Sequence, residues 1–150
     1  MPDEIARAAI REIEPLQLTD TVGAGAERII AEELPALPVV DEEGRFAGIF
    51  GEREFMQALF PGYVGELASA RMVSRTIDSV IERREGCRAE PVGEHMTTDH
   101  VVVDDEYSDT ELAEIFLHHR VLIVPIATDG RVHAIVTRND FFRELVRKLG

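Results

Sequence analysis

Hydrophobic and turn residues follow one another in an order that occurs twice along the chain. Residues 38–55 read PVVDEEGRFAGIFGEREF and residues 125–141 read PIATDGRVHAIVTRNDF. Gly44 aligns with Gly130 and Phe55 with Phe141, so the two copies lie 86 positions apart. An ordered repeat of this length is typical of a chain built from one supersecondary unit made twice. We therefore expect two copies of a single small fold.

Each copy predicts the same succession of elements. A short apolar run opens it, an amphipathic helix follows, and two strands joined by a glycine-containing turn come before a closing helix. In the first copy these are the strand 16–18, the helix 25–33, the strands 38–40 and 45–50 and the helix 52–60; in the second they are 101–103, 109–119, 123–127, 131–136 and 138–149. Ser108 or Asp109 is placed as the N-cap of the second amphipathic helix. The predicted fold is therefore α+β, with two β-α-β-β-α units.

A helical insertion is predicted between the copies. Pro61 and Gly62 end the first closing helix, and apolar residues then recur at helical spacing up to Gly86, which is placed as a C-terminal cap. Pro91 interrupts the chain before a short predicted helix over 92–96, and residues 5–13 predict a similar helix before the first copy. We divide the chain into repeat 1 with its N-terminal helix (1–60), a helical linker (61–90) and repeat 2 (91–150).

The composition of the chain disfavours several classes of function and location. The 150 residues include 29 acidic and 16 basic side chains, a net charge of −13, which disfavours binding to nucleic acid or to an anionic membrane. The longest apolar stretch, 121–127, is far shorter than the roughly 20 residues of a membrane span. Cys87 stands alone, so no disulfide forms within the chain and a reducing cytoplasm is expected.

The junction between the last strand and the last helix carries the main candidate chemistry. Thr137 and Asp140 stand three residues apart where free N–H groups and the helix dipole favour a phosphate. A carboxylate one turn along can accept hydrogen bonds from a vicinal diol, and Arg138 supplies a positive charge. The same pair is also close to a capping box, as is Gly51 with Glu54. Both interpretations stay open, and they are compatible.

The remaining polar clusters favour no catalyst and no metal site. His118 and His119 are adjacent on a helix and cannot share an ion, although with Arg120 they remain candidates for a modest anion patch. The run 104–106 is acidic, which is typical of a solvated turn before a helix, with Mg²⁺ binding as the alternative. No nucleophile elbow, Walker loop or zinc-protease motif occurs. The chain is therefore not expected to be an enzyme.

The repeated skeleton P-h-h-x-x-x-G-x-h-x-G-h-h-T-x-x-D resembles that of CBS domains, which occur in pairs called Bateman modules. The resemblance extends from about Glu12 to Lys148 and is closer in the second copy. It implies that the two repeats pack by pseudo-twofold symmetry and that the module forms a homodimer. It also implies a cleft between the repeats for an adenosine-containing ligand such as AMP, ADP, ATP or S-adenosylmethionine.

The resemblance assigns a role to individual residues of the second copy. Asp140 would accept hydrogen bonds from ribose hydroxyls, Thr137 would donate to a phosphate, and Arg138 would add positive charge. The purine would lie on apolar strand surface formed by Val101, Val102, Val103, Ile123, Val124 and Pro125. The first copy has Gly51 and Glu54 in place of the threonine and the aspartate of the motif. One competent cleft per chain is therefore expected.

These expectations combine into one functional hypothesis and one alternative. The chain is expected to be a stand-alone regulatory module that senses an adenine nucleotide or other adenosyl ligand and signals to a separate partner protein. The alternative is a structural interaction or dimerisation module without a ligand. Neither hypothesis requires a cofactor.

Overall fold

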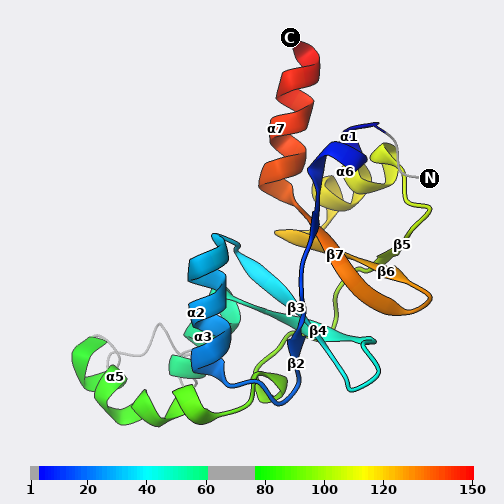
Figure 1. The fold of residues 1–150 in the computed structure, drawn as a ribbon. Helices are drawn as coiled ribbons and strands as arrows, with labels where there is room; N and C mark the ends of the chain where they lie inside the picture. Colours follow the sequence, from blue (N-terminus) through cyan, green and yellow to red (C-terminus); the bar gives the residue numbers. More distant parts are fainter. Residues whose placement is uncertain (1–3, 61–76) are drawn as a thin grey trace.

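The computed structural model describes residues 4–60 and 77–150, which form two mixed sheets with helices packed on them (Figure 1). Each sheet contains the three strands of one predicted repeat, so the α+β fold class and the β-α-β-β-α order are confirmed. None of the helices within these residues is long and apolar enough to span a bilayer.

The first repeat forms a three-stranded sheet in the order β2-β3-β4. Its strands are β2 (Leu16–Gln17), β3 (Ala36–Val40) and β4 (Phe46–Gly51), and its helices are α2 (Val22–Glu32) and α3 (Glu52–Leu59). The Thr21 hydroxyl accepts a hydrogen bond from the Ala24 amide and caps α2, which ends where Glu33 adopts a left-handed conformation with φ of 54°. Strand β3 is buried along its whole length, as expected for the central strand of a covered sheet.

The second repeat repeats this layout and gains a fourth strand. Its elements are β5 (Val103–Asp104), α6 (Asp109–His118), β6 (Ile123–Thr128), β7 (Arg131–Thr137) and α7 (Arg138–Leu149). Ser108 caps α6 by accepting a hydrogen bond from the Glu111 amide, which settles the choice between Ser108 and Asp109. The added strand is β1 (Ile10–Glu12), which pairs with β7, so the sheet order is β1-β7-β6-β5.

Residues 4–12 therefore lie on the second repeat, and the chain then crosses to the first (Figure 1). Helix α1 (Glu4–Ala9) packs against α7 and α6, and the Asp109 carboxylate accepts a hydrogen bond of 2.6 Å from the Ala6 amide. A single helix over residues 5–13 was a wrong prediction, because α1 ends at Ala9 and residues 10–12 extend to pair with the edge of β7.

The lead-in to the second repeat makes the reciprocal contact. Thr97 exchanges two backbone hydrogen bonds of 2.8 and 2.9 Å with Ile49 of β4, on the first sheet. The two hairpin turns also meet, since the Val132 amide donates to the Gly44 carbonyl at 3.0 Å. Gly44 and Gly130 have φ of 81° and 82°, the left-handed region that these turns require and glycine adopts without strain.

The two cores are joined through the sheets. The core of the first repeat includes Leu37, Val39 and Phe50 and also takes in Ile123 and Ile135 of the second repeat. The second core gathers around Tyr107, Leu112, Val124 and Val136, together with alanines of α1. Burial of these apolar surfaces holds the repeats together and fixes the position of the crevices between them.

Part of the linker is also described. Helix α5 (Ile77–Arg84) continues into the 3₁₀ helix η1 (Glu85–Ala89), and η2 (Val92–Glu94) follows. The prediction of Gly86 as a helix cap was wrong, because the chain tightens into a 3₁₀ turn there and needs no left-handed residue. The short helix predicted over 92–96 is the turn η2, whereas Pro61, Gly62 and Val73 lie outside the described residues.

Candidate ligand cleft

Among the clefts where the repeats meet, two contain the helix start of one copy of the repeated motif each. The larger has a volume of about 750 Å³ and includes the first turn of α7. The smaller, of about 210 Å³, includes the first turn of α3. Both are lined by residues from both repeats, so a molecule bound in either contacts both halves of the chain.

The larger cleft is built on the N-terminus of α7. Thr137 ends β7, is only 3% exposed, and accepts a hydrogen bond of 3.0 Å from the Asp140 amide through its Oγ1 atom. The Arg138 amide donates to the Leu122 carbonyl at 2.9 Å, which holds the start of the helix against the segment before β6. Thr137, Arg138 and Asn139 therefore face the cleft at the positive end of the helix dipole.

Asp140 is engaged by a residue from the other end of the chain. Arg11 of β1 donates to both oxygens of its carboxylate, with Nε–Oδ2 at 2.6 Å and Nη2–Oδ1 at 3.1 Å. The Arg11 hydrogen bond holds the pKa of Asp140 below its ordinary value, and the same bond raises the pKa of Arg11. The carboxylate predicted to bind a ribose thus already has a cationic partner.

The threonine forms half of a capping box. Its hydroxyl caps α7 as predicted, while the Asp140 carboxylate turns away to Arg11. Sequence inspection missed Arg11, which is separated from Asp140 by 129 positions and belongs to a segment with no motif. Arg11 also lines the cleft, where it adds a second guanidinium to that of Arg138.

The predicted purine surface is not assembled at this cleft. Val101, Val102 and Val103 line a separate hollow beside α6, together with Ile115, His118 and His119. Ile123 lines the smaller cleft, and Val124 is fully buried in the second core. Pro125 of β6 is buried and pairs with Ile135 of β7. The motif lies at the end of β7, whose neighbours are β1 and β6, and β5 lies at the far edge of the sheet. The apolar surface of the larger cleft comes instead from Ile29, Leu34, Pro35 and Leu122.

The smaller cleft shows why the first copy departs from the motif. A Cβ atom on Gly51 would lie 2.5 Å from the Pro35 carbonyl oxygen and 2.6 Å from the Ala36 Cβ, so no threonine fits there. Glu54 is 6% exposed, and its two oxygens accept hydrogen bonds from the Gly51 amide at 2.9 Å and the Thr97 hydroxyl at 2.7 Å. The capping box predicted here is confirmed, and its carboxylate is fully used in holding the lead-in to repeat 2.

The other polar groups near the second repeat make local contacts. The Asp104 carboxylate accepts from the Glu106 amide at 2.9 Å, and the Asp105 carboxylate accepts from the Thr128 hydroxyl at 2.6 Å, an arrangement typical of a turn. At the smaller cleft, His100 is bonded to the Val101 carbonyl at 2.9 Å, and burial lowers its pKa, which favours the neutral ring.

Comparison with known proteins identifies the family that this fold and its clefts define. Residues 5–61 and 92–147 match the CBS domain, so the chain belongs to the CBS domain family and carries two copies. A curated relative is an uncharacterized 17.7 kDa protein of Acidianus ambivalens, which is 25% identical over 147 residues, or 97% of this chain and 75% of the relative.

Solved structures share the fold over nearly the whole chain. A putative acetoin utilization protein, AcuB, from Vibrio cholerae gives a TM-score of 0.74 at 18% identity, over 99% of this chain and 94% of its own. The CBS domain of a membrane protein from Sphaerobacter thermophilus gives 0.69 at 24% identity, over 93% and 85%. CBSX2, solved in complex with AMP, gives 0.65 at 19% identity, over 92% and 90%. The protein is a CBS-pair module.

Proposed function

We propose that this CBS pair is a regulatory module that binds an adenine nucleotide or another adenosyl compound in the larger cleft. The observation that carries the proposal is the convergence of Thr137 and Arg138, at the start of α7, with Arg11 of β1 in a cleft between the repeats. Two guanidinium groups and a helix N-terminus meet in this cleft, which Glu33 and Glu52 also line, in a protein with a net charge of −13. Such a combination suits a phosphate group.

The walls of the cleft suit the rest of such a ligand. Ile29, Leu34 and Leu122 supply apolar surface on which a purine can lie. Asp140 lies next to the cleft. If the Arg11 guanidinium turns from this carboxylate to the phosphate, the two ribose hydroxyls can donate hydrogen bonds to Asp140 in its place. The AMP complex of the structurally similar CBSX2 supports this class of ligand.

A bound ligand would couple the repeats. Arg11 and Thr137 belong to the second sheet, whereas Leu34 and Pro35 precede β3 of the first. A ligand that contacts both groups binds one relative arrangement of the repeats more tightly and shifts the population toward it. A partner protein would recognise the resulting change of the surface. The ligand cleft and the partner's binding surface would then be coupled, because both depend on which arrangement of the repeats is populated.

Isothermal titration against AMP, ADP, ATP and S-adenosylmethionine tests this proposal. We expect one of them to bind, and Arg138→Gln to weaken binding about tenfold or more, as expected for the loss of a charge-assisted hydrogen bond. Arg53→Gln is the matched control, because Arg53 lies in the first turn of α3, one position further along than Arg138 in α7, and lines the smaller cleft. Absence of binding by all four compounds, or equal weakening by both variants, would contradict the proposal.

A second candidate function is a structural interaction module without a ligand. The internal satisfaction of the two motif carboxylates favours it, since Arg11 covers both oxygens of Asp140, and Gly51 and Thr97 cover those of Glu54. This function predicts no heat in the titrations while the protein remains folded and dimeric. The two candidates are therefore separated by one set of measurements.

A further inference from the structure

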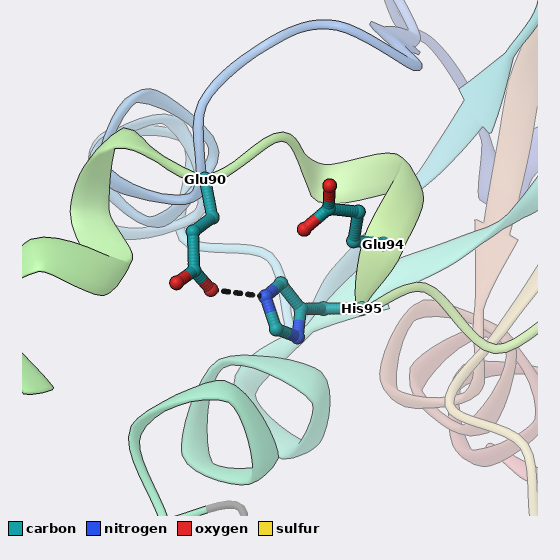
Figure 2. A group of neighbouring side chains, drawn as sticks. All are labelled: Glu90, Glu94 and His95. Atoms are coloured by element: carbon teal, nitrogen blue, oxygen red, sulfur yellow. Dashed lines mark hydrogen bonds and ion pairs between the residues drawn. The ribbon is translucent and has the colours of Figure 1, made fainter.

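Three metal-ligating side chains converge where the linker joins the second repeat. The ligand atoms of Glu90, Glu94 and His95 all lie within 4.8 Å of one another (Figure 2). His95 Nε2 is 2.7 Å from Glu90 Oε1, and Glu94 points toward the same space from the exposed side. Glu90 and His95 are partly buried and Glu94 is exposed, so the cluster lies at the surface of the protein. It lies outside both ligand clefts.

The backbone that carries these side chains is held rigidly by the first repeat. The Glu90 carbonyl accepts from the Val22 amide at 2.8 Å, and the Val92 amide donates to the Asp20 carbonyl at 2.8 Å. The next residue, Gly93, donates to the Leu18 carbonyl at 3.1 Å. Glu90, Val92 and Gly93 are thus tied to the lead-in and N-terminus of α2, which contributes the preorganisation that a binding site needs.

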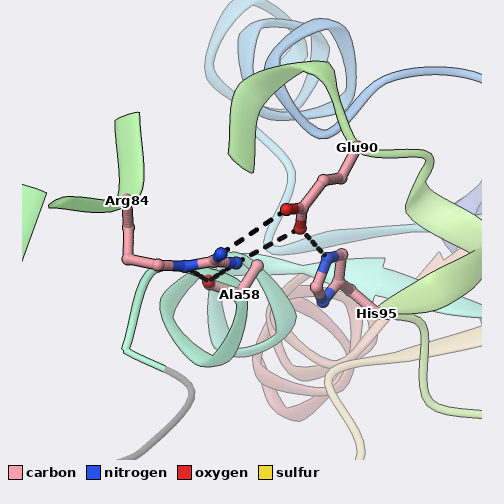
Figure 3. Close-up of polar contacts among 4 residues, drawn as sticks. All are labelled: Ala58, Arg84, Glu90 and His95. Carbon is pink, nitrogen blue, oxygen red and sulfur yellow. Dashed lines mark hydrogen bonds and ion pairs between the residues drawn. The ribbon is translucent and has the colours of Figure 1, made fainter. Parts of the chain in front are cut away.

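A second layer of contacts orients Glu90. Arg84 Nη2 lies 3.2 Å from Glu90 Oε1, and Arg84 Nη1 lies 3.5 Å from Oε2 (Figure 3). The same guanidinium also donates to the Ala58 carbonyl at 2.8 and 3.2 Å, which holds it in place independently of Glu90. Carboxylate ligands of metal ions are commonly hydrogen-bonded in this way by a neighbouring group.

The geometry points to a site for a divalent transition-metal ion, bound by His95 Nε2 and one carboxylate oxygen each from Glu90 and Glu94. A tetrahedral ion with bonds of about 2.0–2.2 Å separates its ligands by roughly 3.4 Å. The pair His95 Nε2 and Glu90 Oε1, now 2.7 Å apart, therefore has to open slightly, and the exposed Glu94 has to rotate toward the ion. The fourth position faces solvent. An imidazole ligand favours Zn²⁺ and similar ions over Mg²⁺ or Ca²⁺, which prefer sites made of oxygen atoms alone.

The local charges are compatible with this occupant. The hydrogen bonds from His95 and then from Arg84 lower the pKa of Glu90, the direction that favours the anionic carboxylate. A metal ion binds the lone pair of His95 Nε2, so a proton carried by that atom leaves to solvent when the ion binds. Arg84 keeps its contact with Ala58, so its charge remains in the second layer.

Titration of the full chain with Zn²⁺ after treatment with a chelator tests this site. We expect saturation at one ion per chain and a loss of affinity of about tenfold or more in Glu94→Gln, whose side chain is exposed and whose replacement leaves the fold intact. Glu85→Gln is the matched control, because Glu85 is an exposed glutamate of η1 outside the cluster and its replacement should leave affinity unchanged.

Three results would overturn the assignment. They are the absence of a saturable site in the wild type, equal affinity in the wild type and in both Glu94→Gln and His95→Gln, or loss of binding only in the double variant His118→Gln/His119→Gln. A second readout keeps the test independent of the binding assay: Zn²⁺ should raise the thermal midpoint of the wild type and not that of Glu94→Gln. Nucleotides are absent from these titrations, so failure here leaves the ligand cleft untouched.

Discussion

At the residue scale, the two copies of the repeat differ most where the last strand passes into the closing helix. Thr137 caps α7 with its hydroxyl, whereas Gly51 caps α3 through backbone alone because Pro35 and Ala36 occupy the space that a side chain would need. The loss of the motif hydroxyl in the first copy is therefore a packing requirement of the chain as it is now folded.

Gly51→Ala should accordingly destabilise the protein. We expect a loss of about 1–3 kcal/mol in the free energy of unfolding, the usual cost of overpacking. Gly86→Ala is the control, since a Cβ there meets nothing within 4 Å and its backbone is not left-handed. That change should be neutral or slightly stabilising. Urea unfolding measures the difference in stability between the two variants. Equal stability would show that the backbone at Pro35 moves to make room for the added methyl group.

The buried hydroxyl of Tyr107 is expected to lower the stability of the fold. Tyr107 is 1% exposed in the second core, and its hydroxyl makes no hydrogen bond among the described residues. Burial also raises the pKa of this phenol. Because a buried polar group without a partner costs about 1–3 kcal/mol, Tyr107→Phe should be neutral or raise the free energy of unfolding by about 1 kcal/mol. A loss greater than about 1 kcal/mol in urea unfolding would reveal a partner for this hydroxyl.

The ion pair between Arg11 and Asp140 predicts that the free energy of unfolding decreases at acidic pH. The pKa of Asp140 is lowered in the folded state, so the pair stabilises the protein above the ordinary value of 3.8 and stops doing so as the pH falls through the lower folded value. Because Arg11 is 42% exposed and solvent screens the pair, we expect the pair to contribute only about 0.5–1 kcal/mol to the free energy of unfolding.

Arg11→Gln provides the measurement. At pH 7 the variant should unfold more easily than the wild type by that amount, and the difference should shrink as the pH falls below the ordinary pKa of Asp140. Arg147→Gln is the control for loss of a surface charge, because Arg147 pairs with Glu144 on the exposed face of α7. A difference that is constant with pH would indicate that Arg11 acts through packing alone.

At the scale of elements, the two repeats are interlocked by exchanged segments. Strand β1 lies on the sheet of the second repeat, and Thr97 lies on β4 of the first. Each sheet thus has its last strand covered by the lead-in of the other repeat, which protects edges that would otherwise be exposed. Separating the repeats would break both pairings, so we expect the described parts to unfold as one cooperative unit.

Thr97→Val probes this interlock without changing the backbone pairing. The substitution removes the hydroxyl that donates to the buried Glu54 carboxylate at 2.7 Å, and it should cost about 1–2 kcal/mol in the free energy of unfolding. The neighbouring Thr98 is exposed like Thr97, but its hydroxyl has no hydrogen bond to the described residues, which makes Thr98→Val a matched control with an expected change near zero. If both variants unfold alike in urea, the side chain of Thr97 does not hold the lead-in segment.

At the scale of the whole molecule, α7 extends from the body (Figure 1). Apolar residues form a stripe on its exposed surface. Phe142 is 60% exposed, Val146 50% and Leu149 89%, and the spacing of these residues places them on one side of the helix. Phe142 also lines the larger cleft beside the exposed Ile30, so the stripe continues onto the first repeat. We propose a second copy of the chain as its partner, in a homodimer.

The double variant Phe142→Glu/Val146→Glu should therefore be monomeric where the wild type is dimeric, because like charges would replace apolar contacts across a twofold interface. Light scattering coupled to size exclusion measures the mass. Ile77→Glu/Ile81→Glu is the matched control, since these residues have the same spacing, are 67% and 42% exposed, and lie on α5 at the other end of the molecule (Figure 1). A monomeric wild type, or an equal effect of the two variants, would exclude this interface.

Local patterns were sufficient to predict most of the fold. The duplicated spacing of apolar residues, the glycines of the two hairpin turns and the caps at Ser108 and Thr137 each act within a few neighbouring residues, so they can be recognised without coordinates. The N-terminal segment and the end of α5 were mispredicted because their conformations depend on what they contact. Residues 10–12 become a strand only because the edge of β7 is available to them.

The composition of the cleft was decided by tertiary structure. The amino-acid sequence by itself determined two β-α-β-β-α units and a hydroxyl, a cation and a carboxylate at the start of the last helix. The crossing of β1 into the second sheet brought Arg11 to Asp140 and left Val101–Val103 at the opposite edge. Contacts between residues more than a hundred positions apart leave no periodic signal in a single sequence, because they depend on how complete sheets pack against each other.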